Sequence, residues 1–321
     1  MTSIPQPVFI VGSWRSGTTI TAKLLNHLPG VCVAKETGFI TESLRLLQQV
    51  PSAQALTPLL AQVNSWLQTN GWTGRVTIEG FRAFCERSGI EGPRAFLYYV
   101  WTLDCEQPLQ ELRFVGDNTP LYVLAIPQLL ELLPDARFIH VVRDPRDVVC
   151  STLNLRFGAH DALVAAMEWN TCLGSWLMAE RYLDAGVFTS FRYEDLCSTP
   201  AAVLQQLAEF LECPDGAAEA ALQHQMQTPG ESSVFSKVAE SDHHRNLSNP
   251  LSAARVGRYR HALTAKQIRD IEVTARSGML AYGYQPDAEG LHPLATEDRS
   301  RILQAMIRDV LRRLRFRIRG R

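Results

Sequence analysis

The strongest constraint on the fold is an apolar run that leads into a glycine-bracketed loop, since residues 9–19 read FIVGSWRSGTT. Residues 8–11 are apolar, as in a buried strand, and residues 16–28 place their apolar side chains on one side of a predicted helix. A strand, a glycine loop and a helix in this order present backbone N–H groups and a positive helix end to an anion. We therefore predict an anion-binding loop here.

The loop departs from that of nucleotide triphosphatases at its cationic position. Those loops read G-x-x-x-x-G-K followed by Ser or Thr. Here Thr18 occupies the lysine position, and the cation of the loop is Arg15. A nucleotide or small-molecule kinase stays open as an alternative, although we find neither the triphosphate cation nor the magnesium ligands that it needs.

Short apolar runs alternate with helical patterns along most of the chain, which predicts an α/β fold with a parallel sheet covered by helices on both faces. The predicted strands are residues 8–11, 31–34, 113–115, 137–142 and 187–193, and the predicted helices are residues 16–28, 121–133, 146–155, 163–183, 200–211 and 265–282. A mainly helical segment, residues 41–107, interrupts this alternation. We expect it to be an insertion within one α/β domain of residues 1–290.

A second polar motif follows the predicted strand 137–142, in the stretch RFIHVVRDPRDVVCSTL. Arg143 leaves the carboxyl end of that strand, Asp144-Pro145 is typical of a helix start, and Ser151 lies eight residues after Arg143. In open parallel sheets, ligands bind beyond the carboxyl ends of the strands. Both loops should therefore meet at one edge and bind two separate anionic groups of one ligand.

The two motifs, GSWRSGTT and RDPRDVVCS, resemble those of the sulfotransferases that use 3′-phosphoadenosine 5′-phosphosulfate (PAPS). Their order and spacing are those of the family, which has a P-loop-like fold and needs no metal. The pattern is nearest to the tyrosine and carbohydrate sulfotransferases and their bacterial relatives. The resemblance implies that Arg143 and Ser151 bind the 3′-phosphate, and that the first loop binds the 5′-phosphosulfate through Arg15, Ser16, Gly17, Thr18 and Thr19.

Further segments extend the resemblance over roughly the first 285 residues, apart from the helical insertion. FRYEDLCSTP and ARVGRYRHAL are similar to later family segments, and VCVAKET is similar to the second strand and its Glu-Thr. The resemblance implies donor contacts for Tyr193, Gly257 and Arg258. It implies one for Arg245 as well, which lies in the polar stretch 230–250, where the sequence predicts a long loop.

Glu36 directly follows the predicted strand 31–34 and should emerge at the same sheet edge as Arg15. One interpretation is an N-cap of the next helix. The other is a general base that takes the proton from an acceptor hydroxyl, which the family's comparable Glu-Thr supports. A non-catalytic nucleotide-binding protein would not require Glu36. As catalytic residues we therefore predict Glu36 and Arg15, the latter for stabilisation of the leaving group.

The acceptor is not readable from the sequence, but two positions argue against an acidic peptide. Tyrosine sulfotransferases carry an Arg at the position of Gly38 and a Lys at the position of Asn118. We expect a small-molecule, lipid or carbohydrate hydroxyl as acceptor, with a protein tyrosine as the alternative.

Composition excludes several other classes of function. The formal net charge is −1, which gives no global field for nucleic acid. The seven cysteines are scattered without a C-x-x-C pair, which argues against zinc and disulfides and for a reducing compartment. We see no secretion signal and no apolar run long enough to span a membrane. The expected location is cytoplasmic.

Residues 291–321 fall outside the resemblance and end in an arginine-rich stretch. Residues 299–321 contain nine Arg and one acid, and their apolar residues share one helical side. We predict a basic amphipathic helix. It either packs on the domain or lies on an anionic membrane surface, and the sequence leaves both readings open.

Four other polar or reactive positions have structural interpretations. We expect His140, in the middle of a strand, to be a packed core histidine, and Cys150 and Cys172 to be helix-core residues. Asp144 should cap the helix that follows it or pair with an arginine.

Overall fold

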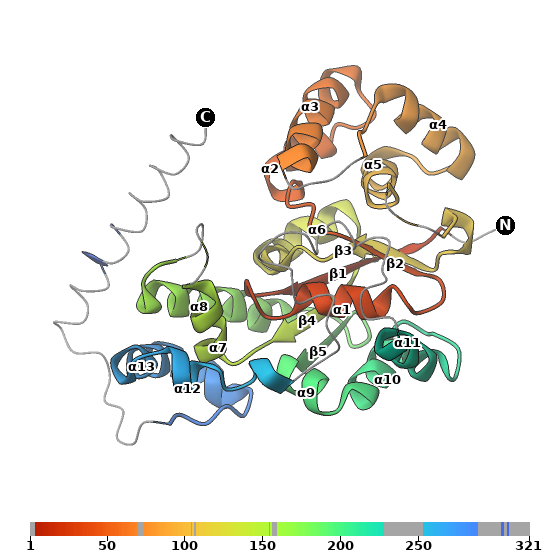
Figure 1. Cartoon of the computed structure of the whole chain (residues 1–321). Helices are drawn as coiled ribbons and strands as arrows, with labels where there is room; N and C mark the ends of the chain where they lie inside the picture. Colours follow the sequence, from red (N-terminus) through yellow and green to blue (C-terminus); the bar gives the residue numbers. More distant parts are fainter. Residues whose placement is uncertain are drawn as a thin grey trace.

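The computed structural model describes residues 4–69, 74–103, 105, 107–153, 155, 159–227, 253–287, 303, 304 and 307. Its centre is a five-stranded parallel sheet with the strand order β2-β3-β1-β4-β5 (Figure 1). The strands are β1 Gln6–Gly12, β2 Val31–Ala34, β3 Phe114–Asp117, β4 Arg137–Val142 and β5 Phe188–Arg192. The predicted α/β class is confirmed, and β3 runs two residues further than predicted, to Asp117.

Buried apolar residues on both faces of β1 explain why this strand lies at the centre, between β3 and β4. Its Val8 and Ile10 face one core and its Phe9 and Val11 face the other. From β1 the chain turns to β2 and β3 on one side, and later to β4 and β5 on the other. The carboxyl ends of the strands around such a reversal are where α/β folds bind ligands.

Four helices cover the first face of the sheet. They are α1 Thr18–Leu25, α9 Tyr193–Ser198, α10 Pro200–Phe210 and α11 Ala217–Gln227. Apolar residues of these helices pack on Val8, Ile10, Ile139 and Phe191 of the sheet. Because α1 is anchored by Ala22, Leu24 and Leu25, its first turn is held at the carboxyl end of β1.

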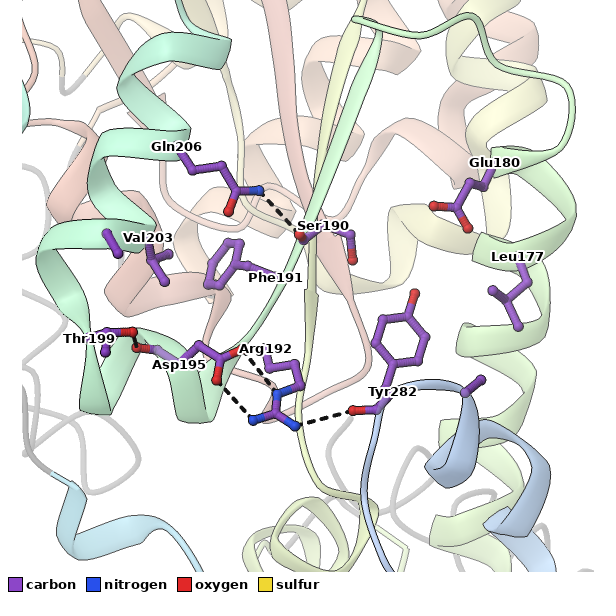
Figure 2. Close-up of a pocket in the computed structure, with 12 residues that line it drawn as sticks. Leu177, Glu180, Ser190, Phe191, Arg192, Asp195, Thr199, Val203, Gln206 and Tyr282 are labelled. Carbon is purple, nitrogen blue, oxygen red and sulfur yellow. Dashed lines mark hydrogen bonds and ion pairs between the residues drawn. The ribbon is translucent and has the colours of Figure 1, made fainter.

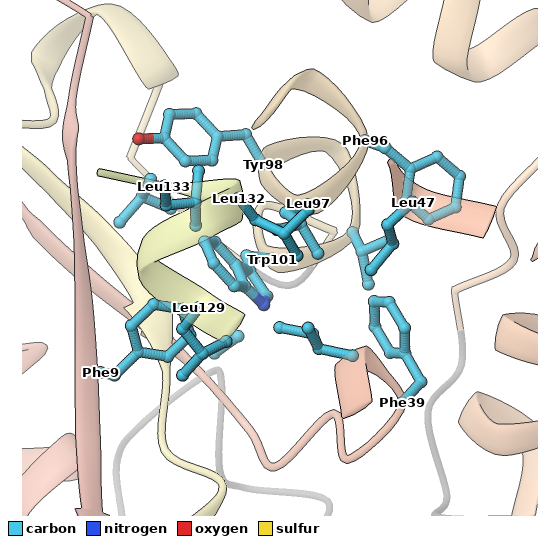
Figure 3. Close-up of a cluster of buried hydrophobic side chains, with 14 of the residues drawn as sticks. Phe9, Phe39, Leu47, Phe96, Leu97, Tyr98, Trp101, Leu129, Leu132 and Leu133 are labelled. Atoms are coloured by element: carbon cyan, nitrogen blue, oxygen red, sulfur yellow. The ribbon is translucent and has the colours of Figure 1, made fainter. Parts of the chain in front are cut away.

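The second face is covered by the 3-10 helix η2 Pro120–Ala125, by α6 Ile126–Leu132 and by the C-terminal half of α8 Ala162–Glu180. The four helices of the predicted insertion pack there too, namely α2 Ile40–Leu47, α3 Ala53–Thr69, α4 Ile78–Ser88 and α5 Gly92–Trp101. Figure 1 shows these four together at one side of the sheet. Trp101 joins them to the sheet, since its ring lies 5.5 Å from that of Phe9 in an edge-on contact (Figure 3).

The remaining elements are η1 Leu109–Glu111, α7 Pro145–Thr152, η4 Ala253–Arg255, α12 Tyr259–Ala262 and α13 Ala265–Ala281. The buried guanidinium of Arg146 holds α7 and α13 together, with ion pairs of 2.7 Å to both Asp144 and Glu272. Asp144 accepts a hydrogen bond from the N–H of Arg146, which confirms its predicted cap role.

The structure corrects the prediction that no cysteines pair, because it joins Cys32 of β2 and Cys105 in a disulfide. These residues are 73 positions apart and meet only through the folding of the insertion, so their spacing could not reveal the pair. The other predictions of this kind are confirmed. His140 is buried and stacks on Trp176 at 4.4 Å, and Cys150 and Cys172 are buried.

Among the described residues, no helix is both long and apolar enough to cross a membrane. Of the predicted C-terminal helix only Leu303, Gln304 and Ile307 are described; they are helical, and Leu303 and Ile307 are exposed. The rest of that prediction lies outside the described residues, and the domain boundaries stay a prediction.

Candidate active site

The first loop presents free backbone donors at the carboxyl end of β1. The buried Ser16 donates from its N–H and its hydroxyl to the carbonyl of Ser13, at 3.3 and 2.8 Å, which closes a tight turn. Gly17 is the N-cap of α1, and no side chain caps this helix. The first N–H groups of α1, at Thr18 and Thr19, therefore remain available to an anion.

Backbone geometry in this loop depends on Gly17 and Arg15. Gly17 has a φ of +108°, and a Cβ there would lie 2.5 Å from the ring of Tyr193. Arg15 has a φ of +65°, which is unfavourable for a residue with a side chain. Such strain persists only where the surroundings impose it, and it concentrates at functional sites.

Arg143, at the carboxyl end of β4, joins the predicted loops. Its guanidinium donates to the carbonyl of Arg15 at 3.1 Å and to that of Arg255 at 2.9 Å, and it lies 4.4 Å from the ring centre of Tyr193. Its Nε is buried without a hydrogen-bond partner among the described residues. Arg143 thus retains a donor for a further acceptor.

Ser151 lies on α7 and contacts the first loop. Its hydroxyl accepts a hydrogen bond of 3.0 Å from Nε of Arg15. The structure therefore brings the two predicted motifs together, as the parallel topology requires. Ser151 therefore contacts Arg15 in this structure. The sequence analysis had instead assigned Ser151 and Arg143 to the same phosphate group.

The segment after η4 completes the site. Asp147 of α7 accepts hydrogen bonds from the N–H of Gly257 at 2.7 Å and from that of Tyr259 at 3.0 Å, and Gly257 has a φ of +73°. These bonds hold Arg255 near Arg143, while the side chain of Arg258 is exposed. Arg245 lies outside the described residues.

Arg255 is a site residue that the sequence reasoning missed. The stretch ARVGRYR holds three arginines, and the resemblance led us to Gly257 and Arg258. The signal that was present is the position of Arg255 two residues before the left-handed Gly257, which turns the chain back towards α7.

Positive charge dominates this part of the site. Burial, followed by the charges of Arg143 and Arg255, lowers the pKa of Arg15. Burial and the charge of Arg143 also lower the pKa of Arg255. None of these three arginines forms an ion pair with a carboxylate within the described part of the chain. An anion bound among them would relieve their mutual repulsion.

Glu36 follows β2, is partly buried and interacts electrostatically with Arg15. Burial, followed by the charge of Asp117, raises the pKa of Glu36 to about 7, and the charge of Arg15 opposes this shift. The N-cap interpretation is wrong, because the N-cap of α2 is Phe39 and no side chain caps that helix. A carboxylate that titrates near neutrality at the edge of an anion site suits a general base.

Two residues at the carboxyl end of β3 also border the site; the sequence analysis missed Asp117 and considered Asn118 only as the position of a family Lys. Asp117 is fully buried and interacts electrostatically with Glu36. Asn118 is fully buried as well, and neither polar atom of its side chain has a hydrogen-bond partner among the described residues. The position of GDNTP at the end of a predicted strand was the available signal.

A cavity of about 590 Å³ lies elsewhere, along the outer edge of β5 and between α8 and α10. Figure 2 shows Arg192 there, between Asp195 at 3.0 Å and the carbonyl of Tyr282 at 3.3 Å. None of the predicted site residues lines this cavity. In the described part of the chain, no group of three His, Cys, Asp or Glu side chains is placed to bind a metal ion.

Comparison with known proteins agrees with this geometry. A model of the sulfotransferase family matches residues 7–216. Protein-tyrosine sulfotransferase A of Caenorhabditis elegans is 24% identical over 64% of this chain and 50% of its own length. The omega-hydroxy-beta-dihydromenaquinone-9 sulfotransferase Stf3 of Mycobacterium tuberculosis is 26% identical over 65% of this chain and 63% of its own length.

The curated relatives are longer than the regions they share with this chain. The chain spans between 26% and 63% of their lengths. Among solved structures, the sulfotransferase domain from the curacin biosynthetic pathway has a TM-score of 0.51 and 18% identity, over 88% of this chain and 99% of that domain. This likeness concerns the fold.

Proposed function

Because this chain belongs to the sulfotransferase family, we propose that it transfers a sulfuryl group from PAPS to a hydroxyl group. The observation that carries the proposal is the cluster of Arg15, Arg143 and Arg255, which have no carboxylate partner within the described residues and lie beside the uncapped start of α1. Such a cluster suits a ligand with two separate anionic groups.

The residues present fit the donor. The first loop, from Arg15 to Thr19, would hold the 5′-phosphosulfate through backbone N–H groups and one guanidinium. Arg143 and Ser151 would bind the 3′-phosphate, and the free Nε of Arg143 supports this assignment. Tyr193, Arg255, Gly257 and Arg258 border the same region, and Arg245 stays a prediction.

The chain's own groups account for the remaining chemistry. The bound donor supplies the sulfuryl group, which moves to the acceptor oxygen as its bond to the 5′-phosphate oxygen breaks. Glu36 takes the proton of the acceptor hydroxyl as that oxygen attacks. Arg15 donates hydrogen bonds to the oxygen on which negative charge develops, where a preorganised donor is most effective.

For the acceptor we propose a small-molecule, lipid or carbohydrate hydroxyl. Gly38 and Asn118 supply no positive charge at the two positions where tyrosine sulfotransferases carry cations for an acidic peptide. The name of the mycobacterial relative gives a hydroxylated menaquinone as its acceptor, which supports an uncharged, apolar molecule here.

The test is transfer from PAPS to a panel of acceptors without added metal, read as the mass increase of one sulfuryl group. The panel should contain a hydroxylated isoprenoid quinone, a sterol, an oligosaccharide, a simple phenol and an acidic tyrosine peptide. We expect transfer to one of the uncharged acceptors and none after Arg143→Ala. Transfer to the peptide alone would contradict the acceptor class, and no transfer to any hydroxyl would contradict the function.

A further inference from the structure

We propose that Asp117 is a positioning residue for the reaction: it fixes the loop that carries Glu36 and sets the charge that this base experiences. The inference rests on the proposed function, because it gives Glu36 the role of base. Asp117 is the last residue of β3, the strand next to β2, and its side chain is fully buried.

The contacts of Asp117 tie two loops together. One carboxylate oxygen accepts a hydrogen bond from the N–H of Thr119 at 2.6 Å, and the other accepts one from the hydroxyl of Thr37. The indole N–H of Trp101 also donates to the second oxygen, at 3.2 Å. Asp117 therefore joins its own strand, the residue after Glu36 and the helical insertion.

A second layer of bonds restrains the same loop. The hydroxyl of Thr119 accepts hydrogen bonds of 3.1 Å from the N–H groups of Thr37 and Gly38. The hydroxyl of Tyr122 accepts one of 3.1 Å from the N–H of Ile40. With the backbone on its C-terminal side held in this way and β2 on the other, Glu36 has little freedom to leave the site.

The donors around Asp117 are uncharged, and no ion pair in the described part of the chain includes it. The negative charge of Asp117 is therefore not neutralised by a cation, and it acts on the nearby Glu36. The charged groups that face Glu36 are Asp117 from β3 and Arg15 from the loop after β1, and they act on it in opposite directions. Tyr122 is the titratable group that faces Asp117 in turn.

This arrangement explains how the base stays effective beside a cationic site. Arg15 alone would hold Glu36 ionised but weakly basic, because a nearby positive charge favours the carboxylate. Burial counteracts that effect most, and the charge of Asp117 adds to it, so that the pKa of Glu36 is raised. Burial raises the pKa of Asp117 itself to about 6, against the hydrogen bonds from Thr37 and Thr119, so it is mostly ionised at neutral pH.

The decisive variant is Asp117→Asn, which keeps the shape but removes the charge. In the pH profile of kcat/KM, the acid limb follows the ionisation of Glu36. We expect this limb to move to lower pH by roughly one unit, because a nearby like charge has been lost, with the affinity for adenosine 3′,5′-bisphosphate unchanged. Glu194→Gln is the matched control, since Glu194 is a partly buried carboxylate beyond β5, bonded to the hydroxyl of Tyr284 at 2.6 Å and to the N–H of Asp144 at 3.0 Å. That control should leave the limb in place.

Thr37→Val removes the hydrogen bond between the Thr37 hydroxyl and Asp117 without changing any charge. This variant tests the inference on its own if Asp117→Asn does not fold. It should lower kcat by about tenfold, less than the roughly 10²–10⁴ that loss of the general base itself costs, with donor affinity unchanged. Thr102→Val, which removes a hydroxyl bond of 2.7 Å to the carbonyl of Tyr98, should have no such effect. An unmoved acid limb in Asp117→Asn, or a normal kcat in Thr37→Val, would overturn the inference. A wild type without sulfotransfer would instead contradict the proposed function.

Discussion

Arg15 has the left-handed backbone conformation, which costs a residue with a side chain about 1–2 kcal/mol. It is also partly buried beside two other arginines. Both features destabilise the fold, and they accompany a guanidinium whose Nε donates a hydrogen bond to the hydroxyl of Ser151. We interpret them as the structural cost of a cation that acts on the leaving group.

Arg15→Ala should lower turnover by about 10²–10³ while changing donor affinity less, because the charge matters most as the bridging bond breaks. Single-turnover rates and calorimetry of donor binding separate the two effects. Arg15→Gly should lose the same activity and unfold at a higher temperature than Arg15→Ala, since glycine accepts a φ of +65°. Loss of donor affinity alone would show that Arg15 only anchors the donor.

As the proposed base, Glu36 should make the rate depend on pH. A base works in its deprotonated form, and the pKa of Glu36 is about 7. The kcat/KM of the free enzyme should therefore be constant well above pH 7 and fall by about tenfold per unit well below it. Glu36→Gln should lower turnover by about 10²–10⁴ at pH 8 and leave donor binding nearly intact. A twofold loss, or a rate independent of pH between 5.5 and 8, would remove Glu36 from the mechanism.

At the scale of elements, the first loop and α1 depend on a close approach to Tyr193. Gly17→Ala adds a Cβ where φ is +108° and where the ring lies 2.5 Å away. We expect it to lower the free energy of unfolding by about 1–3 kcal/mol and to weaken donor binding. Gly174→Ala is the control, since that α8 position has no atom within 4 Å of the added Cβ. It should raise stability by about 0.5–1 kcal/mol.

Chemical denaturation of the two variants measures this difference. A Gly17→Ala protein as stable as the wild type, and with the same donor affinity, would mean that the loop shifts away from Tyr193 without consequence. The close packing of α1 against that ring would then have no functional meaning.

The sequence predicted the elements well where a pattern is local. The apolar runs placed β2 and β4 at their observed bounds, because strands buried on both faces are continuously apolar. Helix ends were less accurate. The start of α1 is Thr18, whereas the pattern began at residue 16, because Ser16 and Gly17 form the turn that exposes the N–H groups. The segment predicted as one helix at 121–133 divides into η2 and α6, and Pro127 lies in the first turn of α6.

Site residues that depend on tertiary contacts could not be predicted in the same way. Arg15, Glu36 and Arg143 follow strands, so parallel topology alone brings them to one edge. Asp117 ends a strand as well, but its hydrogen bond with Thr37 and that of Arg143 with the carbonyl of Arg255 join residues that are distant in the chain. The Cys32–Cys105 disulfide likewise joins two segments that are distant in the chain, so the sequence did not reveal it.

At the scale of the whole molecule, the arginine-rich residues 299–321 give a prediction that rests on sequence. If they form a basic amphipathic helix on a membrane, attraction to anionic lipid is worth about 1 kcal/mol per basic residue near the surface. The full chain should then sediment with vesicles of anionic lipid at low salt and be released at high salt, because salt screens this attraction.

Deletion of residues 299–321 should abolish vesicle binding and preserve donor binding. If the helix packs on the domain instead, the same deletion should lower the unfolding temperature, and the full chain should not sediment with the vesicles. Neutral vesicles are the control for purely apolar insertion.

The central claim is that the cationic edge of the sheet binds a nucleotide with both a 3′-phosphate and a 5′-phosphate. Calorimetry without magnesium tests it most directly, by comparing adenosine 3′,5′-bisphosphate with adenosine 5′-monophosphate. Losing a charge-assisted contact of the kind assigned to Arg143 typically costs about 1.5–3 kcal/mol, or roughly tenfold to over a hundredfold in affinity. We predict a preference of that size for the bisphosphate, and its loss in Arg143→Ala. Equal affinity for the two nucleotides, or binding that requires magnesium, would contradict the account.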